Sequence, residues 1–247
     1  MENADWDLFK KAESGDKAAA AAIDELGDAY KHGFGVKKDW ALAVKYYRMA
    51  AEAGNAAAER SLGYCYENGQ GVEQDYEAAV HWYLEAASRG HMAAQYNLGV
   101  CYAKGRGVEQ DWAEAAAWYE KAAVQGDMSA QINLGNCYCT GRGVEKGMEE
   151  AAAWWGEAAE QGDAGAQYNL GQCFYSGNGV DQDYEQAVRW YGRAAGQGHA
   201  RAQYNLGVCC ENGIGTEHDM EMAVAMYSTA ARQGNENALA ALKRLGM

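Results

Sequence analysis

The chain has 247 residues, of which 49% are hydrophobic, and a formal net charge of −14. The acidic balance excludes nucleic acids and anionic membrane surfaces as expected partners, because both need a basic binding surface. No basic start followed by an apolar run opens the chain, and no segment is apolar for long enough to span a bilayer. The cytoplasm is therefore the expected location.

A Leu-Gly pair recurs every 36 residues along almost the whole chain. A fixed period between 20 and 50 residues predicts a solenoid of stacked repeats. We therefore expect one all-α domain over residues 1–247, with six repeats in residues 16–234. The pairs are Leu26-Gly27, Leu62-Gly63, Leu98-Gly99, Leu134-Gly135, Leu170-Gly171 and Leu206-Gly207.

A single helix is expected at each end of the chain. Residues 1–15 contain Trp6, Phe9 and Ala12 at helical spacing and resemble the second half of a repeat, which predicts an N-terminal capping helix. Residues 235–247 predict a C-terminal capping helix with Leu239, Leu242 and Leu245 facing inward.

Each repeat is predicted to hold two helices joined by a glycine-containing turn. Asp, Asn or His precedes the first helix, and Asp precedes the second except at Gly147, so these residues are expected to be N-caps. A Gly-x-Gly follows each first helix and predicts a turn, because a phosphate-binding loop would follow a strand. Trp82, Trp118, Trp154 and Trp190 share one register and are expected to belong to the core.

Five of the seven cysteines, Cys65, Cys101, Cys137, Cys173 and Cys209, share one register of the repeat. Equivalent positions in stacked helices lie on the order of 10 Å apart, whereas a disulfide needs Cα atoms within about 7 Å. We therefore expect reduced, buried thiols. The sequence contains no His-Glu-x-x-His and no spaced Cys-x-x-Cys pair, so neither a metal, a cofactor nor a catalytic site is predicted.

The side of each first helix opposite its leucine is the candidate binding surface. At about 100° per residue, Tyr96, Asn97, Val100 and Ala103 lie opposite Leu98. The same registers in other repeats complete the predicted site. The candidate residues are Arg60, Ser61, Tyr64, Tyr96, Asn97, Val100, Ile132, Asn133, Asn136, Tyr168, Asn169, Gln172, Tyr204, Asn205 and Val208.

Asparagine occupies one register of this surface four times, at Asn97, Asn133, Asn169 and Asn205. Helix propensity does not explain it, since asparagine is a poor helix former. Its amide can pair with the backbone of an extended peptide, and the tyrosines beside it supply rigid contact area. The alternative is that each asparagine bonds to a neighbouring helix.

The repeat resembles the Sel1-like repeat family, which is related to tetratricopeptide repeats. The residues that carry the resemblance in the third repeat are Ala94, Leu98-Gly99, Tyr102, Gly105, Gly107-Val108, Asp111, Ala115, Trp118-Tyr119, Ala122-Ala123 and Gly126. The pattern recurs six times. The resemblance implies a right-handed superhelix that acts as an adaptor between proteins and is not an enzyme.

The expected partner is an extended polypeptide segment, neutral or mildly basic, because the candidate surface lacks a cluster of Lys and Arg that could capture an acidic tail. Two alternatives stay open. The first is a hydrolase or small-molecule binder that uses the aromatic surface for a cell-wall fragment or a β-lactam. The second is a bacterial effector that is secreted and acts by binding proteins.

Overall fold

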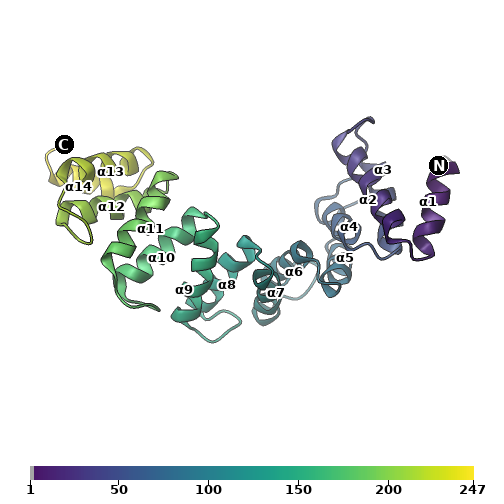
Figure 1. Cartoon of the computed structure of the whole chain (residues 1–247), viewed down its shortest axis with the longest axis horizontal. Coiled ribbons are helices and arrows are strands. Elements are labelled where there is room, and N and C mark those ends of the chain that lie inside the picture. The colour runs from purple at the N-terminus through teal and green to yellow at the C-terminus, as the bar shows by residue number, and fades with distance from the viewer. Residues whose placement is uncertain (1–2) are drawn as a thin grey trace. The chain divides into compact units, whose positions relative to one another are not determined.

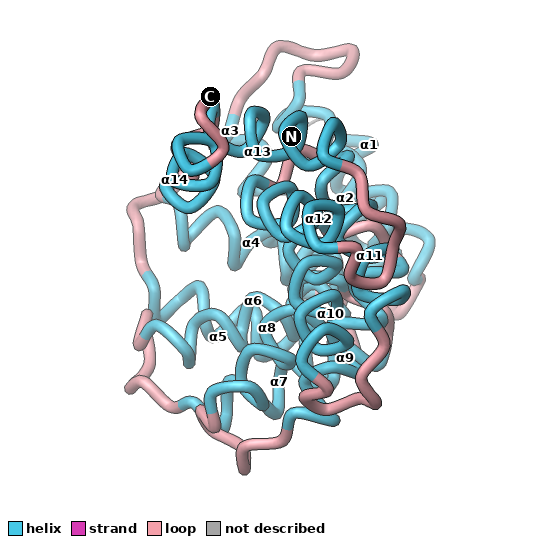
Figure 2. Tube along the Cα trace, turned by 90° about the vertical axis from the view of Figure 1, so that its left-hand side faces the viewer, coloured by secondary structure: helices cyan, strands magenta, loops and turns pink. Residues whose placement is uncertain are grey.

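The computed structural model describes residues 3–247, with side chains from residue 7 onward, so the predicted inward position of Trp6 lies outside the described residues. Over residues 3–247 the chain forms helices and loops and no strands (Figures 1 and 2). The prediction of an all-α solenoid of helical repeats is confirmed. The handedness of a superhelix stays a prediction.

The chain divides into two compact units, Met1–Asp127 and Met128–Met247, and each is described by itself. Their helices carry the labels of Figure 1. Unit 1 contains α1 (Asn3–Glu13), α2 (Lys17–His32), α3 (Trp40–Glu52), α4 (Ala56–Asn68), α5 (Tyr76–Ser88), α6 (Met92–Lys104) and α7 (Trp112–Val124). Unit 2 contains α8 (Met128–Thr140), α9 (Met148–Glu160), α10 (Ala164–Ser176), α11 (Tyr184–Gly196), α12 (Ala200–Asn212), α13 (Met220–Arg232) and α14 (Glu236–Arg244).

Each repeat is a helical hairpin whose two helices pack on each other, such as α4 with α5 or α10 with α11. The second helix also packs on the first helix of the following repeat, such as α5 with α6 or α11 with α12. The division of residues 1–247 into one domain with caps at 1–15 and 235–247 stays a prediction.

The glycine of the Leu-Gly pair leaves room for an aromatic ring of the same repeat. A Cβ at Gly171 would lie 2.7 Å from Cδ1 of Tyr191, well inside the ordinary contact distance of about 3.5–4.0 Å between carbons. The ring itself is buried, with 1% of Tyr191 exposed. The same contact occurs in every repeat, at Gly27, Gly63, Gly99, Gly135, Gly171 and Gly207. The leucine register therefore sets which face is buried, and the glycine sets how closely the hairpin closes.

The Gly-x-Gly turn uses its two glycines differently. The first, such as Gly177 with φ 67°, is a left-handed residue that ends the helix. The second, such as Gly179 with φ 80°, also lies against the preceding repeat, where a Cβ would be 2.1 Å from the carbonyl oxygen of Met148. Gly71, Gly107 and Gly215 make equivalent contacts. The turn therefore joins consecutive repeats as well as the two helices of one repeat.

The predicted N-caps are confirmed for the helices α3 to α7 and α10 to α14. Asp75, Asp111 and Asp183 each accept a hydrogen bond from the backbone of the helix that they precede. Nδ1 of His91 and of His199 accepts one in the same way, at 3.3 and 3.2 Å. The second helix of the fourth repeat begins at Met148, after a Gly147 that has no side-chain cap.

A buried glutamine joins consecutive repeats. Gln95, Gln167 and Gln203 donate to a carbonyl oxygen on the last turn of the preceding second helix, at 3.1–3.2 Å. Each accepts from a glutamine after the second helix of its own repeat, such as Gln197 for Gln167 at 2.9 Å. Glutamine is a poor core residue on average, but here both ends of the amide are paired. These uncharged contacts are called the amide pairs below.

The second repeat replaces the amide pair with an ion pair. Glu59 is 1% exposed and lies 3.4 Å from Arg89, while its Oε2 atom is buried without a hydrogen-bond partner among the described residues. Burial raises the pKa of Glu59, and Arg89 opposes that shift. A carboxylate cannot donate to a carbonyl as glutamine does.

Two expected positions are wrong. Leu239 is 51% exposed, because its register is the one that carries the buried glutamine and no seventh second helix covers it among residues 3–247. Ala103 is buried and does not face outward.

The tryptophan column belongs to the core to different degrees. Trp190 is buried, and Trp82 and Trp118 are half-buried and pack against the core. The residue after each tryptophan is the one that fills the hairpin.

Candidate functional site

The fifteen predicted site residues lie on α4, α6, α8, α10 and α12, three on each helix. We call the outward surface of these helices the first-helix face. Thirteen of these residues are half-buried, and Asn136 and Gln172 are exposed. The face tyrosines rest on the buried tyrosine of their own repeat, with ring centroids of Tyr168 and Tyr191 6.1 Å apart and those of Tyr204 and Tyr227 5.7 Å apart. Their rings are therefore held in place.

In unit 2 the first-helix face is hollowed at three adjoining places. One hollow of about 250 Å³ lies over α10, α11 and α12, and we call it the amide hollow. A second, of about 280 Å³, and a third, of about 470 Å³, share Tyr168 and Arg201, and the third shares Tyr204 and Asn205 with the amide hollow. The amide hollow is lined by Gln172, Tyr175, Tyr191, Tyr204, Asn205 and Val208.

The predicted residues of α10 and α12 all line these hollows. Sequence reasoning missed Tyr175, Tyr191, His199 and Arg201. Tyr175 could have been found, because it lies three residues after Gln172 on the same helix face. Tyr191 belongs to the core register, and only its hydroxyl reaches the face.

The amide of Gln172 is the polar centre of the amide hollow. Its Oε1 atom accepts from the Tyr191 hydroxyl and from Nδ2 of Asn205 at 3.1 Å. Burial raises the pKa of Tyr191, so the phenol stays protonated and donates. Asn205 therefore bonds to a neighbouring helix, which was the alternative to pairing with a bound peptide. Asn97, Asn133 and Asn169 make no such bond to the described residues, so the four asparagines are not equivalent.

His199 forms one wall of the second hollow. Its ring stacks on Tyr168 with centroids 4.8 Å apart, and its Nδ1 caps α12. Burial lowers the pKa of His199, and the Arg201 charge lowers it further. A neutral imidazole is required for the cap, because a protonated Nδ1 is a donor and cannot accept from the backbone.

Unit 1 presents charged groups at the same registers. Burial raises the pKa of Asp24 to about 6, and Oδ1 of Asp24 and Nε of Arg60 are buried without hydrogen-bond partners among the described residues. Lys31 and Arg60 lie over the ring of Tyr64, at 5.9 and 5.6 Å from its centroid. The first-helix face is therefore charged at the start of unit 1 and neutral over the amide hollow.

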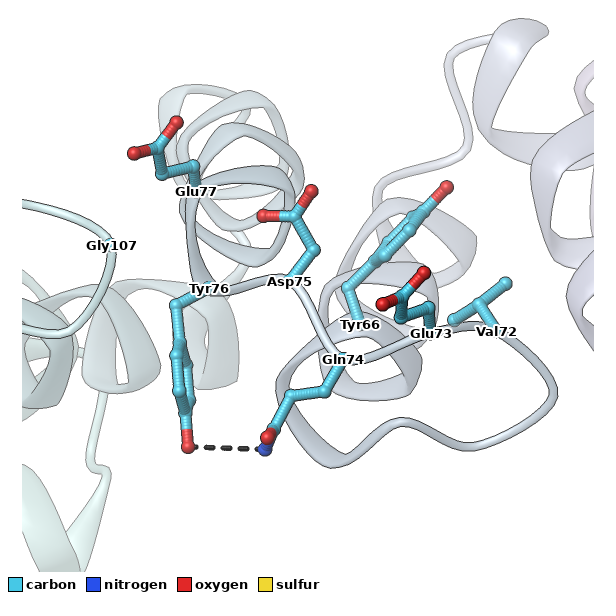
Figure 3. Close-up of a pocket in the computed structure, with 8 residues that line it drawn as sticks. All are labelled: Tyr66, Val72, Glu73, Gln74, Asp75, Tyr76, Glu77 and Gly107. Carbon is cyan, nitrogen blue, oxygen red and sulfur yellow. Dashed lines mark hydrogen bonds between the residues drawn. The ribbon is translucent and has the colours of Figure 1, made fainter.

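A further hollow of about 740 Å³ lies on the loops of unit 1, away from the predicted face (Figure 3). Several of its polar groups already have partners. The Tyr66 hydroxyl accepts from Arg48 at 2.6 Å, the Tyr76 hydroxyl accepts from Gln74 at 3.1 Å, and Asp75 caps α5. Glu73 and Glu77 add two carboxylates to the lining.

The buried thiols are poor nucleophiles. All seven cysteines are free, and all but Cys139 are buried. Burial raises the pKa of Cys65, Cys173 and Cys209 to about 11, so these thiols stay protonated at neutral pH. From residue 3 onward no group of three His, Cys, Asp or Glu side chains could hold a metal ion, and no helix is long and apolar enough to cross a membrane.

A family model described as Sel1 repeat matches residues 20–55, 56–91, 93–127, 129–163, 164–199 and 200–235. The chain belongs to the Sel1 repeat family. The predicted resemblance is confirmed, and the boundaries of the matched units fall at the short turns between repeats. Sel1 repeat proteins are in general non-enzymatic scaffolds for protein interactions.

Two solved structures are similar over most of this Sel1 repeat chain. A protective antigen present in uropathogenic Escherichia coli strains, with an SLR fold, is 39% identical with a TM-score of 0.84, and the match covers 95% of this chain and 50% of that one. A Sel1 repeat protein from Oxalobacter formigenes is 35% identical with a TM-score of 0.75, covering 87% and 84%. The chain thus spans about half the length of the E. coli antigen. No curated protein matches the sequence.

Proposed function

We propose that this Sel1 repeat chain is a scaffold that binds an extended polypeptide segment of another protein on the first-helix face of unit 2. The observation that supports it is the row of three adjoining hollows over α10, α12 and α14. They share lining residues, so one extended segment can cross all three. Their walls combine fixed aromatic rings with amide groups, the combination enriched at protein interfaces.

The charge of the surface supports a neutral or mildly basic segment. Arg201 is the basic side chain that lines these hollows and Glu236 is the acidic one, so the lining has no net charge. The chain as a whole carries −14, which disfavours approach of an acidic segment. We place the protein in the cytoplasm as part of this proposal, because reduced thiols are typical of that compartment.

The two alternatives have less support. A hydrolase needs an activated nucleophile, and the thiols of Cys65 and Cys209, for example, are buried with raised pKa values. The E. coli relative is described as a protective antigen, which would suit an exported protein. That description belongs to a chain about twice as long, and it names no binding partner.

The test is selection of binding peptides from a displayed random library, followed by titration of a labelled selected peptide. Tyr168→Ala and Tyr204→Ala each remove a fixed ring from the face, and we expect each to weaken binding at least tenfold, as for a hot-spot aromatic at about 1.4 kcal/mol. Met222→Ala is the control, since Met222 is 44% exposed on α13 and lines none of these hollows.

Two outcomes would contradict the proposal. The library yields no binder, or a selected peptide binds both tyrosine variants as tightly as the parent chain. Circular dichroism of each variant checks that the helices are retained.

A further inference from the structure

The amide hollow has hydrogen-bonding capacity that the fold does not use. The Oε1 atom of Gln172 accepts hydrogen bonds from Tyr191 and Asn205, and its Nε2 group makes no bond to the described residues. The Nδ2 group of Asn205 donates to Gln172, and its Oδ1 atom accepts no hydrogen bond from the described residues. One donor and one acceptor from neighbouring helices are thus left at the hollow. A peptide group offers the complementary pair, a carbonyl and an N–H.

The first repeat shows that holding the buried tyrosine does not require an amide. Asp28 lies at the register of Gln172 and accepts from the Tyr47 hydroxyl at 2.6 Å, as Gln172 accepts from Tyr191. Glu67 and Glu211 hold Tyr83 and Tyr227 from the next turn of their helices. A carboxylate is sufficient for the fold, and the amide of Gln172 adds N–H donors that a carboxylate lacks.

The rest of the hollow is apolar and uncharged. The rings of Tyr175 and Tyr204, the hydroxyl of Tyr191 and the side chain of Val208 complete its lining, which contains no ionisable acid or base apart from the phenols. Its volume of about 250 Å³ corresponds to about eight waters at about 30 Å³ each, or to one large residue. A charged side chain placed there would lose part of its hydration and meet no oppositely charged partner in the lining, which is unfavourable.

We propose that the amide hollow is the anchor site for one uncharged, apolar residue of the bound segment, such as leucine. The backbone carbonyl of that residue accepts from Nε2 of Gln172, and its N–H donates to Oδ1 of Asn205. Its side chain lies between Tyr175 and Tyr204 against Val208. This inference rests on the proposed function, and it adds which repeat selects the partner and by what chemistry.

The probe for this site is N-acetyl-L-leucinamide, titrated into the full chain at millimolar concentrations. The side-chain amide signals of Gln172 and Asn205 are followed by ¹H–¹⁵N NMR. We expect both signals to shift and saturate with this probe, and to stay in place with N-acetyl-L-lysinamide and N-acetyl-L-aspartamide, whose side chains are charged. Signals of Asn97 and Asn133 serve as internal references.

Gln172→Glu is the decisive variant. It keeps the acceptor for Tyr191 and Asn205, as Asp28 does for Tyr47, but it removes the N–H donors and adds a charge. We expect at least a tenfold loss of probe affinity with an unchanged urea unfolding midpoint. Gln186→Glu, on α11 outside the hollow, is the charge-matched control and should bind as the parent does. If Gln172→Glu fails to fold, Val208→Ala removes a wall of the hollow and should weaken binding at least threefold.

The outcomes separate this inference from the proposed function. If displayed peptides bind the first-helix face while the probe leaves Gln172 and Asn205 unshifted, or if folded Gln172→Glu binds the probe as the parent does, the anchor site is wrong and the scaffold function stands. If no displayed peptide binds and the probe shifts nothing, both are wrong.

Discussion

The substitution Gly171→Ala tests whether the Leu-Gly pair exists to admit an aromatic ring. The new Cβ would lie 2.7 and 2.8 Å from Cδ1 and Cε1 of Tyr191. The ring would have to retreat by roughly 1 Å to restore an ordinary carbon–carbon contact. It has no space to do so, since Tyr191 is 1% exposed and its hydroxyl is held by Gln172.

The expected result follows from two opposing effects. Overpacking a close-packed site costs about 1–3 kcal/mol, and replacing glycine by alanine inside a helix gains about 1 kcal/mol. We therefore expect Gly171→Ala to destabilise the protein by about 1 kcal/mol. Gly192 lies on α11 directly after Tyr191, and no atom lies within 4 Å of where its Cβ would be. Gly192→Ala should therefore show the helix gain alone and stabilise by about 1 kcal/mol.

The assay is urea unfolding of the parent and both variants, followed by circular dichroism at 222 nm. Repeat arrays need not unfold in one step, so the slopes must agree before midpoints are compared. The decisive result is that the free energy of unfolding falls in Gly171→Ala and rises in Gly192→Ala. If Gly171→Ala stabilises the protein as Gly192→Ala does, the ring-contact explanation of the Leu-Gly pair is refuted.

Three further variants probe the junctions and caps. Glu59→Gln restores the donor found in other repeats and should stabilise the protein by about 1 kcal/mol at pH 7. Because the folded pKa of Glu59 is raised, the parent should lose more stability than this variant as pH rises through that pKa, so equal pH profiles would contradict the assignment. His199→Asn keeps an N-cap without a titrating group. Because the folded pKa of His199 is lowered, the parent should lose more stability than this variant as pH falls below 6.5, and equal losses would contradict the assignment. In urea unfolding, Gly179→Ala should lower the free energy of unfolding by at least 1 kcal/mol more than Gly198→Ala does, since both glycines have positive φ and only Gly179 lies against a neighbouring repeat. Equal losses would show that Gly179 has no role at the junction between repeats.

The framework was predictable because each of its features is local and repeated. Leu98-Gly99 fixes the register, Asp111 begins a helix, and Gly105 ends one, and each depends on contacts within a few residues or one hairpin. Repetition made the pattern visible above the variation at other positions. The inward position predicted for Leu239 was wrong because it was inferred from the apolar residue type and not from the register in the repeat.

The glutamines of the amide pairs form a register that is visible in the sequence, but their structural role was not predicted. Gln95, Gln131, Gln167 and Gln203 recur every 36 residues in the third to sixth repeats. Glutamine is usually solvated, and only the position of Gln125 beside Gln95, 30 residues away in sequence, shows that the amide is buried and paired.

The sequence predicted the helix face on which the candidate site lies, but not which repeats form the site. Helical periodicity puts Tyr204, Asn205 and Val208 on one face, but it treats all six repeats alike. What distinguishes the fifth and sixth repeats is which side chains meet across helices, such as Asn205 with Gln172, and which registers carry charge, such as Asp24 and Arg60. Those depend on tertiary contacts that no periodicity specifies.

The residue between the two glycines of each turn changes from repeat to repeat, although the second glycine keeps its contact. Gly71, Gly107, Gly179 and Gly215 all lie against the backbone of the preceding repeat. The position before the second glycine holds Phe34, Gln70, Arg106, Arg142, Asn178 and Ile214, six different side chains. Arg106 forms an ion pair with Glu67 of the preceding repeat at 3.6 Å and lies over the ring of Tyr76. Each junction can therefore gain or lose a side-chain contact of its own while the backbone contact is kept, and a chain of this kind is lengthened by whole 36-residue units.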